Sequence, residues 1–90
     1  MCNLGHGSYR VDVRQGSVLN VRREPNTNAN NPPLRFNELT QNAQVQIRRL
    51  NNNQPANGLV RGVVVTVNEV RGEWGRIPSG WINLRYCVRI

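Results

Sequence analysis

The chain has 90 residues, which is enough for one small domain with a thin hydrophobic core. Its formal net charge of +7 comes from 12 basic side chains, all of them Arg. The planar guanidinium group favours anionic partners such as wall polymers, carboxylate-bearing peptides or nucleic acid, unless the charge is simply a solvated basic surface. No stretch is apolar for long enough to span a bilayer, and the N-terminus lacks the basic-then-apolar order of a signal peptide.

The chain begins with a predicted leader and a predicted β-hairpin. We expect residues 1–8 to be a flexible leader and residues 9–90 to form a single domain. Apolar and polar residues alternate from Tyr9 to Val13 and again from Leu19 to Arg22, which is the period of half-buried strands. The Gln15-Gly16 turn between these stretches predicts that they pair as a hairpin.

The middle of the chain is rich in residues that interrupt regular structure. Residues 23–33 contain three Pro and four Asn, so they are predicted to form a long loop. The alternation of Val45 and Ile47 with Gln residues predicts the next strand. The polar cluster at 51–58 ends in Asn57-Gly58, a dipeptide that is typical of a hairpin turn.

The last third of the chain again alternates with a period of two. Val63, Val65 and Val67 predict a strand, and Arg71-Gly72 predicts a turn into the strand that carries Trp74. No stretch shows a clear helical period, so we expect negligible helix. The predicted fold class is all-β, a small β-barrel of about five to seven short antiparallel strands, in which closure removes exposed edges.

Several short motifs occur in an order that resembles the bacterial SH3-like (SH3b) domain family. The resemblance covers roughly residues 9–86 and implies a small SH3-like barrel. It also implies a non-catalytic module that holds a peptidoglycan hydrolase, such as a phage endolysin or an autolysin, on the cell wall by binding stem or cross-bridge peptides. The motifs are Leu19-Asn20-Val21-Arg22, Pro25 with Asn26-Thr27-Asn28, Gln44-Val45-Gln46-Ile47, Trp74-Gly75-Arg76-Ile77, and Gly80-Trp81-Ile82 ahead of Leu84 and Tyr86.

The aromatic residues are the leading candidates for a ligand-binding site. If Ile77 points inward, alternation sends Trp74 and Arg76 to the opposite face, where an indole beside a guanidinium forms a peptide platform; the alternative is that Trp74 is barrel wall. One of Trp81 and Ile82 should face outward, and Gly80 would let a ligand backbone approach. Tyr9 is interpreted as structural. The candidate ligand-binding residues are Trp74, Arg76, Trp81, Tyr86, Asn20, Arg22, Asn26 and Asn28, although the Asn residues also suit turns.

The inventory of reactive side chains does not favour catalysis or a bound metal. The chain has one His, one Asp and four Glu, and His6 has no neighbouring carboxylate in sequence to orient it. Two Cys and one His leave a tetrahedral zinc site one ligand short. We therefore predict no enzyme activity, no cofactor and no metal. Cys2 and Cys87 either form a disulfide that ties the two ends of the domain together or remain free thiols.

The predicted partner is bacterial peptidoglycan, with anionic wall polymers as a further target. The predicted location is the cell wall or extracellular space, reached by export of a parent protein or by phage lysis. Two alternatives stay open: a small β-barrel that binds single-stranded nucleic acid by stacking and charge, and a protein–protein scaffold module. The Arg residues are scattered along every segment rather than clustered with the Trp residues, which argues against nucleic acid.

Overall fold

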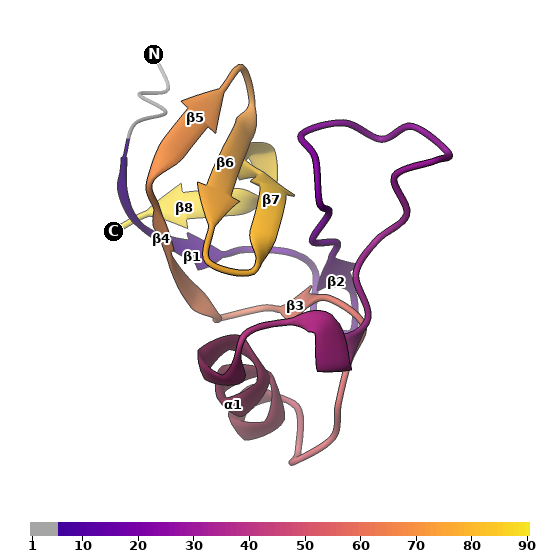
Figure 1. Cartoon of the computed structure of the whole chain (residues 1–90). Coiled ribbons are helices and arrows are strands. Elements are labelled where there is room, and N and C mark those ends of the chain that lie inside the picture. Colours follow the sequence, from indigo (N-terminus) through magenta and orange to yellow (C-terminus); the bar gives the residue numbers. More distant parts are fainter. Residues whose placement is uncertain (1–5) are drawn as a thin grey trace.

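The computed structural model describes residues 6–90, which form eight short strands, one α-helix and two turns of 3₁₀ helix (Figure 1). The strands outnumber the five to seven expected, because two of them are only two residues long. The elements are β1 (Gly7–Val11), β2 (Val18–Leu19), η1 (Phe36–Glu38), α1 (Gln41–Leu50), β3 (Leu59–Val60), β4 (Val64–Val67), β5 (Glu69–Arg71), β6 (Trp74–Ile77), β7 (Gly80–Asn83), η2 (Leu84–Tyr86) and β8 (Cys87–Arg89).

The strands form three small antiparallel sheets, so the all-β prediction is confirmed. The strand orders are β4-β1-β8, β2-β3 and β5-β6-β7. Over residues 6–90 these sheets do not close into one continuous barrel. β1 begins at Gly7, which pairs with Val67, so the sheet starts inside the segment expected to be leader.

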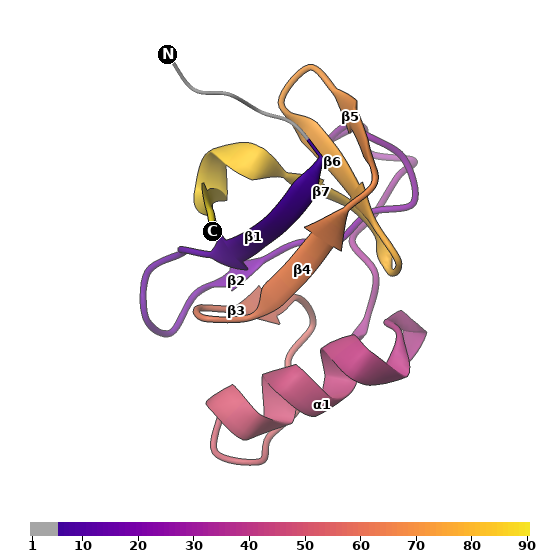
Figure 2. The same ribbon diagram turned by 90° about the vertical axis from the view of Figure 1, so that its left-hand side faces the viewer.

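The predicted N-terminal hairpin is wrong in its pairing, although its turn is present. Residues 15–16 do form a turn, closed by the Ser17 N–H donating to the Arg14 carbonyl at 2.9 Å. β1 nevertheless pairs with β4 and β8, while β2 pairs with β3. Figure 2 shows β1 and β4 side by side. Alternation of apolar and polar residues identifies a strand but not the strand that pairs with it. Any strand that also buries one apolar face can be the hydrogen-bonded neighbour.

The strand predicted around Val45 and Ile47 is wrong, because this segment is the helix α1. Thr40 caps the helix, its hydroxyl accepting the Ala43 N–H at 3.3 Å. Ala43 and Ile47, four residues apart, are the buried positions of the helix, whereas Val45 is 43% exposed. Four residues is one helical turn, so the true period was 3.6 and not two. The expectation of negligible helix therefore also fails.

The helix covers part of a free sheet edge that a closed barrel would have paired. The side-chain amide of Gln46 donates to the Val64 carbonyl and its oxygen accepts the Val64 N–H, both at 2.9 Å. A carboxamide carries the same donor and acceptor as a peptide group. Gln46 therefore satisfies the backbone of edge strand β4 at this position, as a neighbouring strand would.

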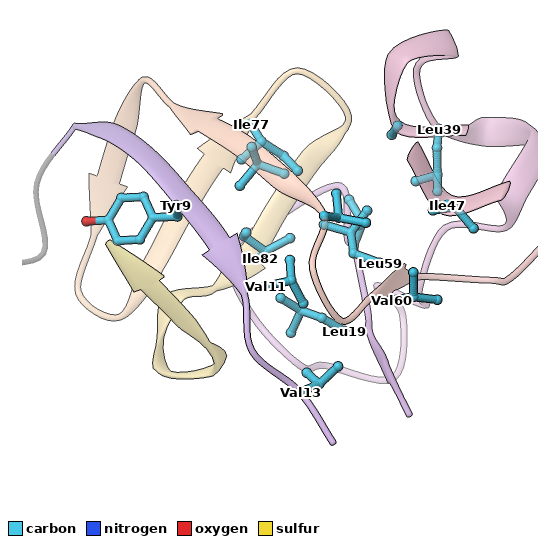
Figure 3. Packing of buried hydrophobic residues seen from close by; sticks show 14 of the residues in the cluster. Tyr9, Val11, Val13, Leu19, Leu39, Ile47, Leu59, Val60, Ile77 and Ile82 are labelled. Atoms are coloured by element: carbon cyan, nitrogen blue, oxygen red, sulfur yellow. The ribbon is translucent and has the colours of Figure 1, made fainter. Parts of the chain in front are cut away.

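A single hydrophobic cluster joins the sheets to the helix. Figure 3 shows Leu39 and Ile47 next to Leu59 and Val60, with Tyr9 at the other end of the cluster. Tyr9 is only 1% exposed, which agrees with its structural interpretation. The full cluster contains Tyr9, Val11, Val13, Leu19, Val21, Leu34, Leu39, Ala43, Ile47, Leu59, Val60, Val63, Val65, Val67, Ile77, Ile82 and Leu84.

The long loop at 23–33 is present as predicted, and a buried Asn organises it. The side-chain amide of Asn31 donates to the carbonyls of Glu24 and Asn26, both at 2.9 Å, and Asn31 is 6% exposed. By contrast, Asn57-Gly58 forms no hairpin, because these residues lie in the connection from α1 to β3. In the described part of the chain, no helix is both long and apolar enough to cross a membrane.

Candidate functional site

A groove of about 510 Å³ lies between the chain that follows β1 and the C-terminal part of the molecule. One wall comes from the end of β1 through β2 to the start of the long loop, and the other comes from β6, β7 and η2. Four of the eight predicted site residues meet here, namely Trp74, Tyr86, Asn20 and Arg22. The remaining lining residues are Asp12, Val13, Arg14, Ser17, Val18, Leu19, Thr27 and Asn83.

Trp74 reaches the groove because of the alternation of β6. Gly75 and Ile77 are buried, Arg76 is exposed and Trp74 is half-buried. A side chain on Gly75 would approach carbon atoms of Leu84 to 2.8–3.0 Å, so Gly75 leaves the space that Leu84 fills. Trp74 therefore lies on the outer face, as predicted, and is partly rather than fully available to a ligand.

Tyr86 forms the second aromatic wall and is 49% exposed. It ends η2, a short turn that is anchored by buried Leu84. The Asn83 side-chain oxygen caps this turn by accepting the Arg85 N–H at 3.0 Å. Leu84 packs against Gly75 on the inner face of β6. This contact also holds η2 in place, and η2 ends at Tyr86.

Polar groups of both charges surround the aromatic walls. The Arg22 guanidinium donates to the Asn31 carbonyl at 2.7 Å, which holds this half-buried side chain in place. Asp12 lies 3.8 Å from Arg61 in an exposed ion pair. Arg14 and Asn20 are exposed. The groove thus offers two aromatic surfaces, amide groups and guanidinium donors to a bound molecule.

Arg76 and Trp81 lie outside this groove although they share the outer face of the β5-β6-β7 sheet. They are register partners in the β6–β7 pair, and register partners project from the same face. Arg76 pairs with Glu69 at 3.5 Å and is exposed. Trp81 is only 6% exposed, and the Arg71 guanidinium lies 5.6 Å from its ring centre.

The expectation that one of Trp81 and Ile82 faces solvent is wrong, since both are buried. Ile82 belongs to the hydrophobic core cluster, whereas Trp81 is buried outside it. The backbone of Arg22 lies against β7 there, and Arg22 and Trp81 exchange N–H···O=C bonds of 2.7 and 2.9 Å. Alternation was correct, but a neighbouring segment covers the outer position.

The proposal that Gly80 admits a ligand backbone is also wrong, because the chain's own backbone occupies that space. A side chain at Gly80 would lie 2.5 Å from the Arg22 carbonyl oxygen, and its φ is +150°. Glycine is therefore required here for the close approach between β7 and the segment that leads into the long loop.

Asn26 and Asn28 lie in the long loop and contribute to its internal hydrogen bonding. The Asn26 side-chain oxygen accepts the Asn28 N–H at 3.1 Å and also a bond from the Asn31 amide at 3.1 Å. Neither residue lines the groove. This arrangement is the turn chemistry that Asn-rich segments usually show, and their role in ligand binding stays a prediction.

Cys2 lies outside the described residues, so its pairing with Cys87 stays a prediction. Cys87 is half-buried at the start of β8 and packs against the core cluster. Burial raises the pKa of its thiol to about 12, and the Asp12 carboxylate adds to the rise. A thiol in this environment is held neutral and is a poor nucleophile at neutral pH.

The raised pKa of Cys87 predicts a pH dependence of stability. The ordinary pKa of the thiol is 9.0, and its pKa in the folded protein is about 12. The contribution of the neutral thiol to stability is therefore fully present below pH 9.0 and is lost as the pH rises toward about 12. Urea unfolding across this range should show a fall in the free energy of unfolding that Cys87→Ser lacks, with Cys2→Ser in both chains. Equal pH dependence of the two chains would contradict this expectation.

Eight of the twelve lining residues were missed by the sequence analysis, and Asp12, Arg14 and Asn83 are among them. Asp12 and Arg14 occupy outward positions of the first alternating stretch. Such a position predicts that a side chain is exposed, but it does not predict which other residues lie near it. Asn83 directly follows the Gly80-Trp81-Ile82 motif and carried no signal of its own. Asp12 and Arg14 share the groove with Trp74 although they lie about 60 residues away in sequence, and local patterns do not report such contacts. Asn83 is the register partner of Trp74 in the β6–β7 pair.

Within residues 6–90, no group of three or more His, Cys, Asp and Glu side chains is placed to hold a metal ion. His6 is exposed at the start of this range. Comparison of the chain with protein-family models, curated proteins and solved structures finds no match.

Proposed function

We propose that this chain is a non-catalytic module that binds a peptide segment of the bacterial cell wall in the groove beside Trp74. One observation carries the proposal: Trp74 and Tyr86, from separate elements, line the same groove together with Asn20 and Arg22. Apart from Gln44-Val45-Gln46-Ile47, which lies in α1, the order of motifs that resembles bacterial SH3-like domains supports it independently of the geometry.

The chemistry of the groove suits an extended peptide. Aromatic surfaces accept aliphatic side chains and flat peptide groups, while side-chain amides and guanidinium donors meet the polar peptide backbone. A groove of about 510 Å³ accommodates a short peptide segment. A contact surface as small as this typically gives weak binding. Weak binding is sufficient for a targeting module. Once the module is bound to the wall, the hydrolase domain linked to it has a raised effective concentration at the wall.

Trp74→Ala tests the proposal most directly. Loss of a central aromatic anchor should weaken binding to purified sacculi by about 1–3 kcal/mol. Because the indole is only half-buried, the midpoint of thermal unfolding should fall little. The measurement is a sacculus pull-down at several protein concentrations. Trp74→Phe, which keeps an aromatic face, should retain part of the binding.

Two outcomes would contradict the assignment of the groove. A Trp74→Ala chain that unfolds like the parent and is still fully pelleted by sacculi would place the binding surface elsewhere. Binding that disappears in moderate salt, combined with tight binding of single-stranded DNA, would instead favour the charge-driven nucleic-acid alternative.

A further inference from the structure

We infer that the groove recognises a carboxylate on its peptide ligand and that the Arg14 guanidinium is the residue that binds it. This inference rests on the proposed function and specifies the ligand's chemistry. Its starting point is the distribution of ion pairs around the groove. The peptide segment must then carry a free carboxylate close to the part that contacts Trp74.

Most of the chain's acidic side chains form ion pairs with arginines outside the groove. Of its five acidic residues, four form ion pairs, and in each case the partner is neither Arg14 nor Arg22. These pairs are Asp12–Arg61, Glu38–Arg23, Glu69 with Arg71 and Arg76, and Glu73–Arg85. The fifth, Glu24, does not line the groove. Residues 1–5 contain no acidic side chain.

The two guanidinium groups in the groove therefore differ in what they offer. Arg22 is half-buried and already donates to the Asn31 carbonyl at 2.7 Å. Arg14 is exposed, and within residues 6–90 it has no ion pair. A guanidinium presents a planar fork that binds a carboxylate through two hydrogen bonds. Arg14 is thus the available carboxylate-binding group, and Arg22 is a fixed donor in the same groove.

The arrangement favours a peptide over a nucleic acid. A strand of nucleic acid needs cations spaced along its phosphate backbone, whereas this groove is lined by two guanidinium groups, of which only Arg14 is exposed. Within the described residues 6–90, other arginines without an ion pair, such as Arg10 and Arg49, do not line the groove. One free guanidinium beside an aromatic wall matches a ligand with one local negative charge.

The test compares untreated sacculi with sacculi whose carboxyl groups have been converted to carboxamides. The variants are Arg14→Gln and the matched control Arg49→Gln, which removes the same charge from an exposed side chain on α1 outside the groove. We expect amidation to weaken binding of the parent about tenfold, the size of one charge-assisted hydrogen-bonded pair. Arg14→Gln should bind untreated sacculi about tenfold more weakly and lose further affinity little on amidation.

The control variant should respond to amidation as the parent does. Arg14→Lys should lie between the parent and Arg14→Gln, because the charge remains but the two-point geometry is lost. Thermal melting of each variant establishes that the fold is unchanged, which we expect because both arginines are exposed.

Four outcomes would overturn the inference. Equal binding of the parent to both kinds of sacculi would remove the carboxylate while leaving the proposed function in place. Equal weakening by Arg14→Gln and Arg49→Gln would show a diffuse effect of net charge. Tight binding of oligo(dT) that Arg14→Gln abolishes would assign the groove to nucleic acid. Binding of the parent to neither kind of sacculi would refute the proposed function itself.

Discussion

Replacing Trp81 with Ala should lower the free energy of unfolding by about 3–5 kcal/mol, the usual cost of deleting a buried Trp side chain. Trp81 is only 6% exposed although it projects from the outer face of its sheet. Its ring lies 5.6 Å from the Arg71 guanidinium, and its backbone is bonded to Arg22. For a domain of this size, such a loss is a large fraction of the total stability, which is about 5–15 kcal/mol.

The matched control is Trp74→Ala, because the chain has two Trp residues and they differ in burial. Urea unfolding should show a clearly smaller loss of stability for Trp74→Ala than for Trp81→Ala. The two variants should also separate in function, since Trp74 lines the groove and Trp81 does not. Similar unfolding free energies for the two variants would contradict the burial difference on which this prediction depends.

Replacing Gly80 with Ala should destabilise the fold by about 3 kcal/mol through backbone strain and displaced hydrogen bonds. The added methyl group would lie 2.5 Å from the Arg22 carbonyl oxygen, at a φ of +150° that side chains rarely adopt. Relief of this contact requires β7 and the Arg22 segment to separate, which disrupts the two backbone bonds between Arg22 and Trp81.

Gly16→Ala isolates the strain from the close contact. Gly16 also has a positive φ, +89°, but a side chain there would meet no atom of the described part of the chain within 4 Å. This variant should lose only about 1–2 kcal/mol, the cost of the backbone conformation alone. Thermal melting of both variants would measure the difference. A Gly80→Ala chain as stable as Gly16→Ala would mean that the contact with Arg22 relaxes at no cost.

The Gly80→Ala substitution also bears on the groove, because the Arg22–Trp81 bridge positions Arg22. The same residue that pairs with β7 through its backbone lines the groove with its side chain. We therefore expect Gly80→Ala to weaken sacculus binding as well, even though Gly80 does not line the groove. Separation of β7 from Arg22 would move one wall of the site relative to the other.

The amino-acid sequence alone determined the strands in which apolar and polar residues alternate because one face is buried and the other is exposed. Val63, Val65 and Val67 are buried as predicted, and Trp74 alternates with Gly75. The long loop at 23–33 followed from its Pro and Asn content. These features are local, because period-two burial and turn chemistry depend on neighbouring residues.

The helix was also encoded locally, and the alternation of Val45 and Ile47 concealed it. Thr40 before a run of good helix formers, and the spacing of Ala43 and Ile47, were the signals that identify it. A short apolar pair separated by two positions fits a strand as well as it fits a helix. Ile47 could be assigned to the core only once Leu59 and Val60 were placed against it.

Only the tertiary structure decided which strands pair and which outward side chains remain available to a ligand. Trp74 and Trp81 both occupy outer positions of their strands, but the Arg22 backbone lies against β7 where Trp81 is buried. Arg14 and Tyr86, more than seventy positions apart in the chain, line the same groove. The physical reason is that alternation specifies a face, whereas the burial of that face depends on which distant segment packs over it.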